Sequence, residues 1–217
     1  MVRIFNTAQD AFEFYFDHIM REGISADGVG TLAVFNESFK MRFPNENEID
    51  TPWRRWKKRY AEVEYEWYKT GNRQPDMVAE ASIWERMKDE NGLVYSNYGF
   101  FWNKNDQLKR MIELLKQDPL TRRAIISHYD INEIQKYGKD TPCNVVLNFY
   151  SYDGESLNLT IFARSIDLVY GFCNDQYCFS RLLMDIADEL CMYTGEMTYM
   201  ITNLHIYEKH FFINERK

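Results

Sequence analysis

Apolar residues recur three or four positions apart along much of the chain, which is the spacing of one face of an α-helix. This spacing predicts helices over residues 8–21, 79–88, 108–116 and 175–193. Thr7 and Asp10 have the spacing of a capping box in front of the first of these helices. Glycine favours the position just past a helix, so we expect Gly23 and Gly195 to end the first and the last helix.

The most aromatic stretch predicts one more helix. Pro52 is expected to open it, because proline suits the first helical turn, and Gly71 to end it. Its apolar residues form one stripe: Trp53, Trp56, Tyr60, Val63 and Trp67. Glu64 lies closest to this stripe. A carboxyl group beside an apolar surface has a raised pKa and can transfer protons near neutral pH. The alternative is a rim residue whose stem packs on Tyr60.

Apolar and polar residues alternate in the remaining segments, as strands require. The expected strands are TLAVF, SFKMRF, AIISHY and MTYMITNLHIY, and residues 144–164 form a hairpin with Asp153 and Gly154 at its turn. Hairpins mixed with helices predict an α+β fold, in which helices cover a mixed, largely antiparallel sheet. We expect a single domain over residues 1–217.

The composition fits a soluble globular protein of 217 residues, apart from 16% aromatic residues. A net charge of -7 argues against a nonspecific nucleic-acid partner. The charged N-terminal segment and the lack of a long apolar run predict neither a signal peptide nor a membrane span. The four cysteines lack metal-ligand spacing, so we expect reduced thiols in the cytoplasm and no metal.

Three features suggest chemistry. Cys143 opens a strand, where a nearby positive charge would make its thiolate a strong nucleophile; the alternative is a buried structural cysteine. Arg122 and Arg123 precede a strand and suit a phosphate, or form a solvated pair. Arg164 and Ser165 end an apolar strand, where a guanidinium is costly unless an anion meets it.

Three more polar residues have simpler interpretations when each is taken alone. Asp175 would cap the long helix, because aspartate is a preferred capping residue. His205 and Tyr207 alternate on the last strand, so they point to one face, where they would pack.

Taken together, DPLTRR, TPCN, RSIDLVYGFCND and LHIY resemble the thymidylate synthase family in order and spacing. DGVGTLAVF and IWERMKDENG resemble its N-terminal strand and its tryptophan-bearing segment, so the resemblance covers about residues 27–210. It implies a one-carbon transferase that uses 5,10-methylenetetrahydrofolate, binds a deoxynucleoside monophosphate and forms a homodimer through a sheet face.

Within the family, EYEWYK, SNYGFFW and GFCND resemble the phage deoxycytidylate hydroxymethylases. The resemblance implies that Cys143 adds to carbon 6 of the pyrimidine, while Glu64 and Tyr98 serve the proton network. The residues implied to bind substrate are Arg164, Ser165, Asp175, His205 and Tyr207, with Arg122 and Arg123 reaching across from a second subunit. Trp84 and Asp167 would line the folate side.

The choice of base rests on Asp175, eleven residues after Arg164, where synthases carry asparagine. A carboxyl group accepts from the cytosine amino group and shares a proton with the ring nitrogen, so it favours dCMP over dUMP. Asn144 agrees, because synthases usually carry histidine directly after the nucleophile. Ala26 stands where synthases place a phosphate-binding arginine.

The second question is what happens to the transferred carbon. Hydroxymethylases add water to it, whereas synthases deliver a hydride and make a methyl group. The chain ends at Lys217 with no counterpart of the synthase segment that seals the folate site, so we expect water to enter. The alternatives are a thymidylate synthase, a hydroxymethylase acting on dUMP or CMP, and a noncatalytic nucleotide- or RNA-binding member of the fold.

Overall fold

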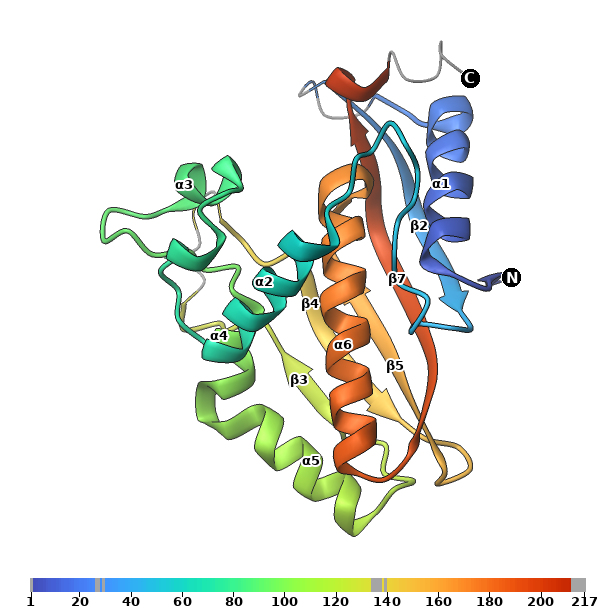
Figure 1. Cartoon of the computed structure of the whole chain (residues 1–217), viewed down its shortest axis with the longest axis vertical. Helices are drawn as coiled ribbons and strands as arrows, with labels where there is room; N and C mark the ends of the chain where they lie inside the picture. Colours follow the sequence, from blue (N-terminus) through green and yellow to red (C-terminus); the bar gives the residue numbers. More distant parts are fainter. Residues whose placement is uncertain (1, 26–27, 29, 134–137, 139, 212–217) are drawn as a thin grey trace.

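The computed structural model describes residues 2–25, 28, 30–133, 138 and 140–211. Among them, seven strands form one mixed sheet in the order β1-β2-β7-β5-β4-β3, with β6 also paired to β7 (Figure 1). The strands are β1 (Arg3–Phe5), β2 (Thr31–Met41), β3 (Ile125–Ser127), β4 (Asn144–Tyr150), β5 (Ser156–Ala163), β6 (Ile166–Asp167) and β7 (Tyr193–Tyr207). β7 runs antiparallel to β2 and parallel to β5 and β6.

The helices gather on one face of this sheet, with α6 along its middle and α1 beside β2 (Figure 1). The α-helices are α1 (Ala8–Glu22), α2 (Lys58–Thr70), α3 (Ser82–Met87), α4 (Tyr98–Asn103), α5 (Gln107–Gln117) and α6 (Cys173–Glu189). Short 3-10 helices span Asp76–Val78 and Lys104–Asp106, and a π-helix, Leu168–Phe172, leads into α6. The predicted α+β architecture with a mixed sheet is confirmed.

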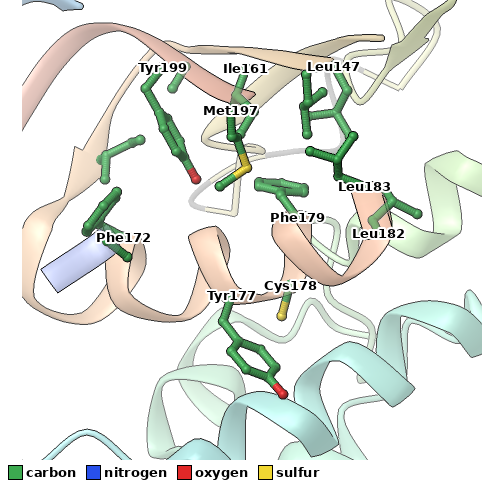
Figure 2. Close-up of a cluster of buried hydrophobic side chains, with 14 of the residues drawn as sticks. Leu147, Ile161, Phe172, Tyr177, Cys178, Phe179, Leu182, Leu183, Met197 and Tyr199 are labelled. Carbon is green, nitrogen blue, oxygen red and sulfur yellow. The ribbon is translucent and has the colours of Figure 1, made fainter. Parts of the chain in front are cut away.

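Both sides of α6 are buried (Figure 2). Phe179 and Leu183 point toward the sheet, where Leu147, Ile161 and Met197 are fully buried. On the other side of the helix, Cys178 faces α2, and its Sγ lies 3.8 Å from the Ala61 carbonyl oxygen. Burying each such apolar side chain contributes roughly 1.5–3 kcal/mol. α6 therefore fixes the position of α2 relative to the sheet.

Several local predictions are confirmed. The Thr7 hydroxyl accepts from the Asp10 amide, and the Asp10 carboxylate accepts from the Thr7 amide, which is the expected capping box before α1. Gly71 ends α2 in the left-handed region. At the β4–β5 turn, the Asp153 carboxylate accepts from two backbone amides and Gly154 adopts a φ of 78°.

The predicted helix start at Pro52 is wrong, because α2 begins only at Lys58. Arg55 adopts a φ of 49°, which breaks a helix before it can form. The first tryptophans of the aromatic stripe serve other contacts: Trp53 packs on Phe16 of α1 at 4.7 Å between ring centroids, and the Trp56 indole donates to Asn174 of α6. Helical spacing in this segment therefore reflects packing on α1 and α6.

Two other boundaries differ from expectation. TLAVF and SFKMRF form one strand, β2, with Asn36 at a φ of 58° inside it. The long helix ends at Glu189, well before Gly195, which lies within β7. A Cβ on Gly195 would lie 2.5 Å from the Asn158 Oδ1, so this glycine serves close strand packing.

Gly99 sets the spacing between α4 and α2. A Cβ built there would lie 1.5 Å from the carbonyl oxygen of Tyr68, so no larger residue fits without moving one of the two helices. The neighbouring Tyr98 stacks edgewise on Tyr68 at 5.4 Å. The glycine thus lets Tyr98 approach the helix that carries Glu64.

The face of the sheet away from the helices leaves apolar side chains in solvent. Phe162 of β5 pairs with Met200 of β7, and Ile125 lies on the same face of β3. Their exposed fractions are 38% for Phe162, 41% for Met200 and 47% for Ile125. Three large apolar residues on one flat face are typical of a surface that another chain covers.

Candidate active site

An irregularity crosses three neighbouring strands at one level of the sheet. The β2–β7 register skips Asn36 and Thr202, and the pairing of β5 with β7 stops at Ala163 and resumes at Ile166 of β6. Arg164 and Ser165 occupy this gap. Neither residue pairs with β7 at this point, and their side chains make other contacts: the Arg164 guanidinium bonds to the segment before β4, and the Ser165 hydroxyl lies near His205.

Cys143 lies directly before β4, and Arg164 bonds to its backbone and to the two residues before it. The Arg164 amide donates to the Cys143 carbonyl oxygen (3.0 Å), and its guanidinium donates to the Pro142 (3.0 Å) and Thr141 (2.6 Å) carbonyl oxygens. One guanidinium nitrogen lies 3.8 Å from the Cys143 Sγ. Burial raises the pKa of the thiol to about 11, against the lowering effect of Arg164. The prediction of a cysteine beside a positive charge at a strand end fits this geometry.

Asn144 joins three parts of the site. Its Nδ2 donates to the hydroxyl oxygen of Tyr98 (2.9 Å) and to Oδ2 of Asp175 (2.8 Å). Asp175 is in the first turn of α6 and makes no capping bond, so the interpretation of Asp175 as a helix cap is wrong. α4, β4 and α6 therefore meet at one amide group.

Glu64 lies beside this group on α2 and is 3% exposed. Its Oε1 accepts from the Tyr60 hydroxyl (3.1 Å), which in turn accepts from the indole of Trp84 (2.7 Å). Its other oxygen, Oε2, is buried with no hydrogen-bond partner among the described residues. Glu64 contacts Tyr60 of the expected stripe, although Trp53 and Trp56 of that stripe lie outside α2, and the alternative of a rim residue is wrong because Glu64 is buried.

The buried Glu64 and the half-buried Asp175 therefore share the site. Burial, with a further contribution from the charge of Asp175, raises the pKa of Glu64 to about 8. Burial raises the pKa of Asp175 to about 7, against the lowering effect of its hydrogen bond from Asn144. Groups that change protonation near neutral pH can both give and take protons during a reaction.

His205, Ser165 and Tyr207 gather at the end of β7. The Ser165 hydroxyl lies 3.5 Å from Nδ1 of His205, and this nitrogen also lies 2.9 Å from Asn203 Oδ1. The rings of His205 and Tyr207 are 5.3 Å apart, so the two side chains lie together, as alternation along the strand predicted. Together they provide hydroxyl and imidazole groups beside Arg164.

Arg122 and Arg123 are exposed and stand apart from the other predicted residues. The Phe149 amide donates to the Ala124 carbonyl oxygen, so the arginines lie near the far end of β4 from Cys143. Six residues of strand separate Phe149 from Cys143, which is roughly 20 Å. Within one chain, the two arginines do not reach the thiol.

A hollow beside Trp56 and Tyr60 extends the site. Its lining combines aromatic rings with cationic groups, namely Arg54, Arg55, Trp56, Lys57, Tyr60, Tyr170 and Asn174, with Glu80 and Ala81 completing it. Arg54 donates to the Val169 carbonyl oxygen and lies over the ring of Tyr170. Asp167 is placed at the start of the π-helix, where its Oδ1 accepts from the Val169 amide (2.9 Å) and the Tyr170 amide (3.2 Å).

His128 is a residue that sequence reasoning missed. It is fully buried; its Nε2 accepts from the Trp102 indole (3.0 Å), and its Nδ1 donates to the Asn144 carbonyl oxygen (2.8 Å). Burial lowers its pKa to about 4, so the ring is neutral. The only sequence signal was a histidine inside an apolar strand, AIISHY.

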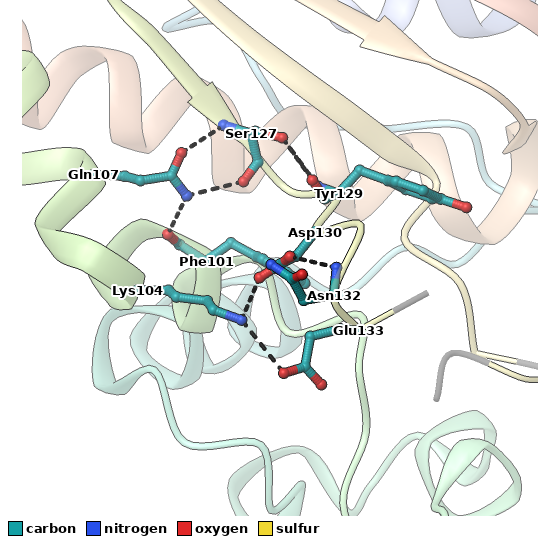
Figure 3. A network of polar contacts seen from close by, with 8 residues as sticks. All are labelled: Phe101, Lys104, Gln107, Ser127, Tyr129, Asp130, Asn132 and Glu133. Carbon is teal, nitrogen blue, oxygen red and sulfur yellow. Dashed lines mark hydrogen bonds and ion pairs between the residues drawn. The ribbon is translucent and has the colours of Figure 1, made fainter. Parts of the chain in front are cut away.

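A polar network ties the segment around His128 to α5 (Figure 3). The Gln107 amide group bonds to both backbone groups of Ser127, at 2.9 Å each, and donates to the Phe101 carbonyl oxygen. Lys104 forms ion pairs with Asp130 (2.5 Å) and Glu133 (3.5 Å). These contacts fix the chain on either side of His128, and through His128 they fix Asn144.

Ala26, which replaces an expected arginine, lies outside the described residues. Within the described part of the chain, no group of three or more potential metal ligands occurs. No helix there is long and apolar enough to span a bilayer. Cys143, Cys173, Cys178 and Cys191 are all free thiols.

A thiol beside a guanidinium, in one site with the carboxyl groups of Glu64 and Asp175, is an arrangement that can support nucleophilic and acid–base chemistry. A protein-family model for thymidylate synthase matches residues 10–215, so the chain belongs to the thymidylate synthase family. Members of this family transfer a one-carbon unit from methylenetetrahydrofolate to a nucleotide, which makes the protein a one-carbon transferase of nucleotide biosynthesis.

Proposed function

We propose that the protein is a deoxycytidylate 5-hydroxymethyltransferase, which converts dCMP to 5-hydroxymethyl-dCMP with 5,10-methylenetetrahydrofolate as co-substrate. The observation that carries this proposal is the half-buried carboxyl group of Asp175, which is hydrogen-bonded to Asn144, the residue directly after Cys143. With a pKa of about 7, Asp175 is available as an acid that donates to the cytosine ring nitrogen while it accepts from the amino group. The uracil ring presents the opposite pattern at these two positions.

The reaction begins when the Cys143 thiolate bonds to carbon 6 of the pyrimidine. The electron pair of the carbon 5–carbon 6 double bond moves to carbon 5, and protonation of the ring nitrogen by Asp175 makes that shift easier. Carbon 5 then takes the one-carbon unit that methylenetetrahydrofolate supplies. Loss of the carbon 5 proton and release of tetrahydrofolate leave an exocyclic methylene group on the nucleotide.

Glu64 is placed to add water to that methylene group. Its Oε2 is buried and unpartnered, so it can accept a proton from a water molecule as the oxygen bonds to the exocyclic carbon. The bond between Cys143 and carbon 6 breaks in the same step, which restores the ring double bond. Tyr98, which accepts from Asn144, would relay protons on the opposite side of the base.

The hollow beside Tyr60 suits the co-substrate. Flat aromatic side chains match a pterin ring, and Arg54, Arg55 and Lys57 match the negative charge of a folate tail. We infer that Trp84 and Asp167 hold the pterin side of the molecule, since Trp84 bonds to Tyr60 and Asp167 borders α6 through the π-helix.

We further propose a homodimer of single-domain subunits that acts in the cytoplasm, in the host cell if the source is a phage. Arg164, Ser165, His205 and Tyr207 would hold the phosphate and the deoxyribose from one subunit. Arg122 and Arg123 would complete the phosphate site from the other subunit, because they lie too far from Cys143 in their own. The exposed face with Ile125, Phe162 and Met200 is the surface that such a dimer would cover.

A product assay tests the proposal. The purified protein is incubated with methylenetetrahydrofolate and either dCMP or dUMP, and the nucleotide and folate products are separated by mass spectrometry. We expect a hydroxymethyl group on dCMP, tetrahydrofolate as the folate product, and no turnover by Cys143→Ser. Formation of dihydrofolate with a methyl product would instead identify a thymidylate synthase. A Cys143→Ser variant with unchanged behaviour would point to a noncatalytic binding protein.

A further inference from the structure

The side chain of Asn144 leaves one polar atom without a partner. The residue is fully buried, and its Oδ1 has no hydrogen-bond partner among the described residues. A buried acceptor that lacks a donor is costly, and such atoms concentrate where a ligand supplies the missing bond.

The contacts of the amide decide which of its two ends lies free. In the proposed complex the Asp175 proton lies on the oxygen that meets the base, so Oδ2 is an acceptor whether or not Asp175 is ionised, and the atom 2.8 Å from Oδ2 is the donor Nδ2. The same Nδ2 donates to the Tyr98 hydroxyl oxygen, so both hydrogens of Nδ2 are used. The reverse orientation of the amide would set Oδ1 against Oδ2 of Asp175, which are both acceptors. In the orientation that remains, Nδ2 bonds to Tyr98 and Asp175, and Oδ1 faces away from both.

The main chain of Asn144 is also fixed. The Asn144 carbonyl oxygen accepts from the neutral His128 ring, whose other nitrogen accepts from the Trp102 indole. Backbone and side chain are thus both immobilised before substrate arrives. A group held in this way can discriminate between ligands, because it cannot move to suit a poor match.

We propose that Oδ1 of Asn144 accepts a hydrogen bond from the exocyclic amino group of the cytosine ring, which makes Asn144 a second determinant of base specificity beside Asp175. The inference rests on the proposed function. The amino group carries two hydrogens: the one nearer the ring nitrogen suits Asp175, and the one nearer carbon 5 suits Asn144. The Asn144 amide bonds to the Asp175 carboxyl group that is proposed to meet the base, so Oδ1 belongs to a group directly beside that carboxyl. Uracil carries an oxygen at this position, and that oxygen would face Oδ1 with no hydrogen between them.

Binding titrations in the Cys143→Ser background test this assignment without covalent chemistry. Three ligands are compared: dCMP, dUMP and the deoxyribonucleotide of pyrimidin-2-one, which lacks the amino group. Asn144→Leu removes the acceptor at similar volume, and Asn6→Leu makes the same change at an exposed position beside β1. Circular dichroism and Tm identify folded variants.

We expect Asn144→Leu to reduce the preference for dCMP over the amino-free nucleotide by about tenfold, the size of one lost buried hydrogen bond. Asn6→Leu should leave that preference unchanged. If Asn144→Leu does not fold, Asn144→Ala should shift the preference in the same direction. Equal weakening of both ligands would overturn the assignment and leave Asn144 a structural role only. A Cys143→Ser parent that binds dUMP better than dCMP would overturn the proposed substrate and this inference together.

Discussion

The Nδ2 atom of Asn144 lies 2.8 Å from Oδ2 of Asp175, although 31 positions separate the two residues in the chain. One of them follows the nucleophile at the start of β4, and the other sits in the first turn of α6. The bond leaves the second oxygen of Asp175 to meet a substrate. In the proposed reaction, recognition of the base by Asp175 and placement of Cys143 therefore depend on the same hydrogen bond.

Asp175→Asn should move the substrate preference from dCMP toward dUMP. The new amide can still accept from Asn144, but its nitrogen offers a donor where cytosine also offers one. We expect the ratio of kcat/KM for dUMP to that for dCMP to rise by about 10- to 100-fold. Steady-state kinetics on both nucleotides measures the ratio, and an unaltered ratio would remove Asp175 from base selection.

Glu64→Gln should abolish turnover yet stabilise the protein at alkaline pH. The folded-state pKa of about 8 lies above the ordinary value near 4.5, so the folded protein binds the proton more tightly than the unfolded chain. The favourable contribution is complete below pH 4.5 and is lost as the pH rises through 8. At pH 8 the variant should gain up to roughly 4 kcal/mol over the wild type.

Chemical denaturation at pH 5 and pH 8 checks this effect. The difference in unfolding free energy between Glu64→Gln and wild type should be small at pH 5 and large at pH 8. A difference independent of pH would show that Glu64 ionises freely in the folded protein.

Arg164→Ala should make Cys143 less reactive. The guanidinium lies 3.8 Å from Sγ and lowers a thiol pKa that burial has raised to about 11. Without it, the pKa rises further and the thiolate fraction at pH 8 falls, so alkylation should slow by about tenfold. Iodoacetamide labelling followed by peptide-resolved mass spectrometry separates Cys143 from the exposed Cys191, whose labelling rate serves as the internal control.

Mixing two inactive variants should restore activity if the site is shared between subunits. In a mixed dimer of Cys143→Ser with the Arg122→Ala/Arg123→Ala double variant, one of the two sites has an intact cysteine and intact arginines. Random reassembly gives about a quarter of wild-type sites. No recovery after confirmed subunit exchange would contradict a phosphate site completed by a second chain.

His128→Leu should destabilise the protein and disturb Asn144. The change leaves the Trp102 indole and the Asn144 carbonyl oxygen buried without partners, which costs about 2–4 kcal/mol. Because the folded-state pKa of His128 is about 4, the wild type loses this residue's contribution as the pH falls from 6.5 toward 4, and the variant should lack that dependence. Urea titrations between pH 4 and pH 7 measure both effects.

Strand ends and caps could be predicted because their causes are local. Arg164 follows an apolar run and Cys143 precedes one, and both lie at strand ends in the site. The start of α2 was predicted wrongly, because Trp53 obeys helical spacing for a nonlocal reason: it packs on Phe16 of α1. Likewise, the residue types at positions 144 and 175 could be related to the choice of base from the sequence. Their contact could not be predicted, because it arises only when α6 packs on the sheet.

Gly99 restricts which sequences this fold can accept. If Asn144 and Asp175 contact the base as proposed, a change of pyrimidine specificity could exchange these two side chains, because neither sets the distance between two backbones. Position 99 has no such freedom, since any side chain would meet the Tyr68 carbonyl oxygen. A change of substrate in this fold would therefore have to leave Gly99 in place, because its role is to let two helices approach.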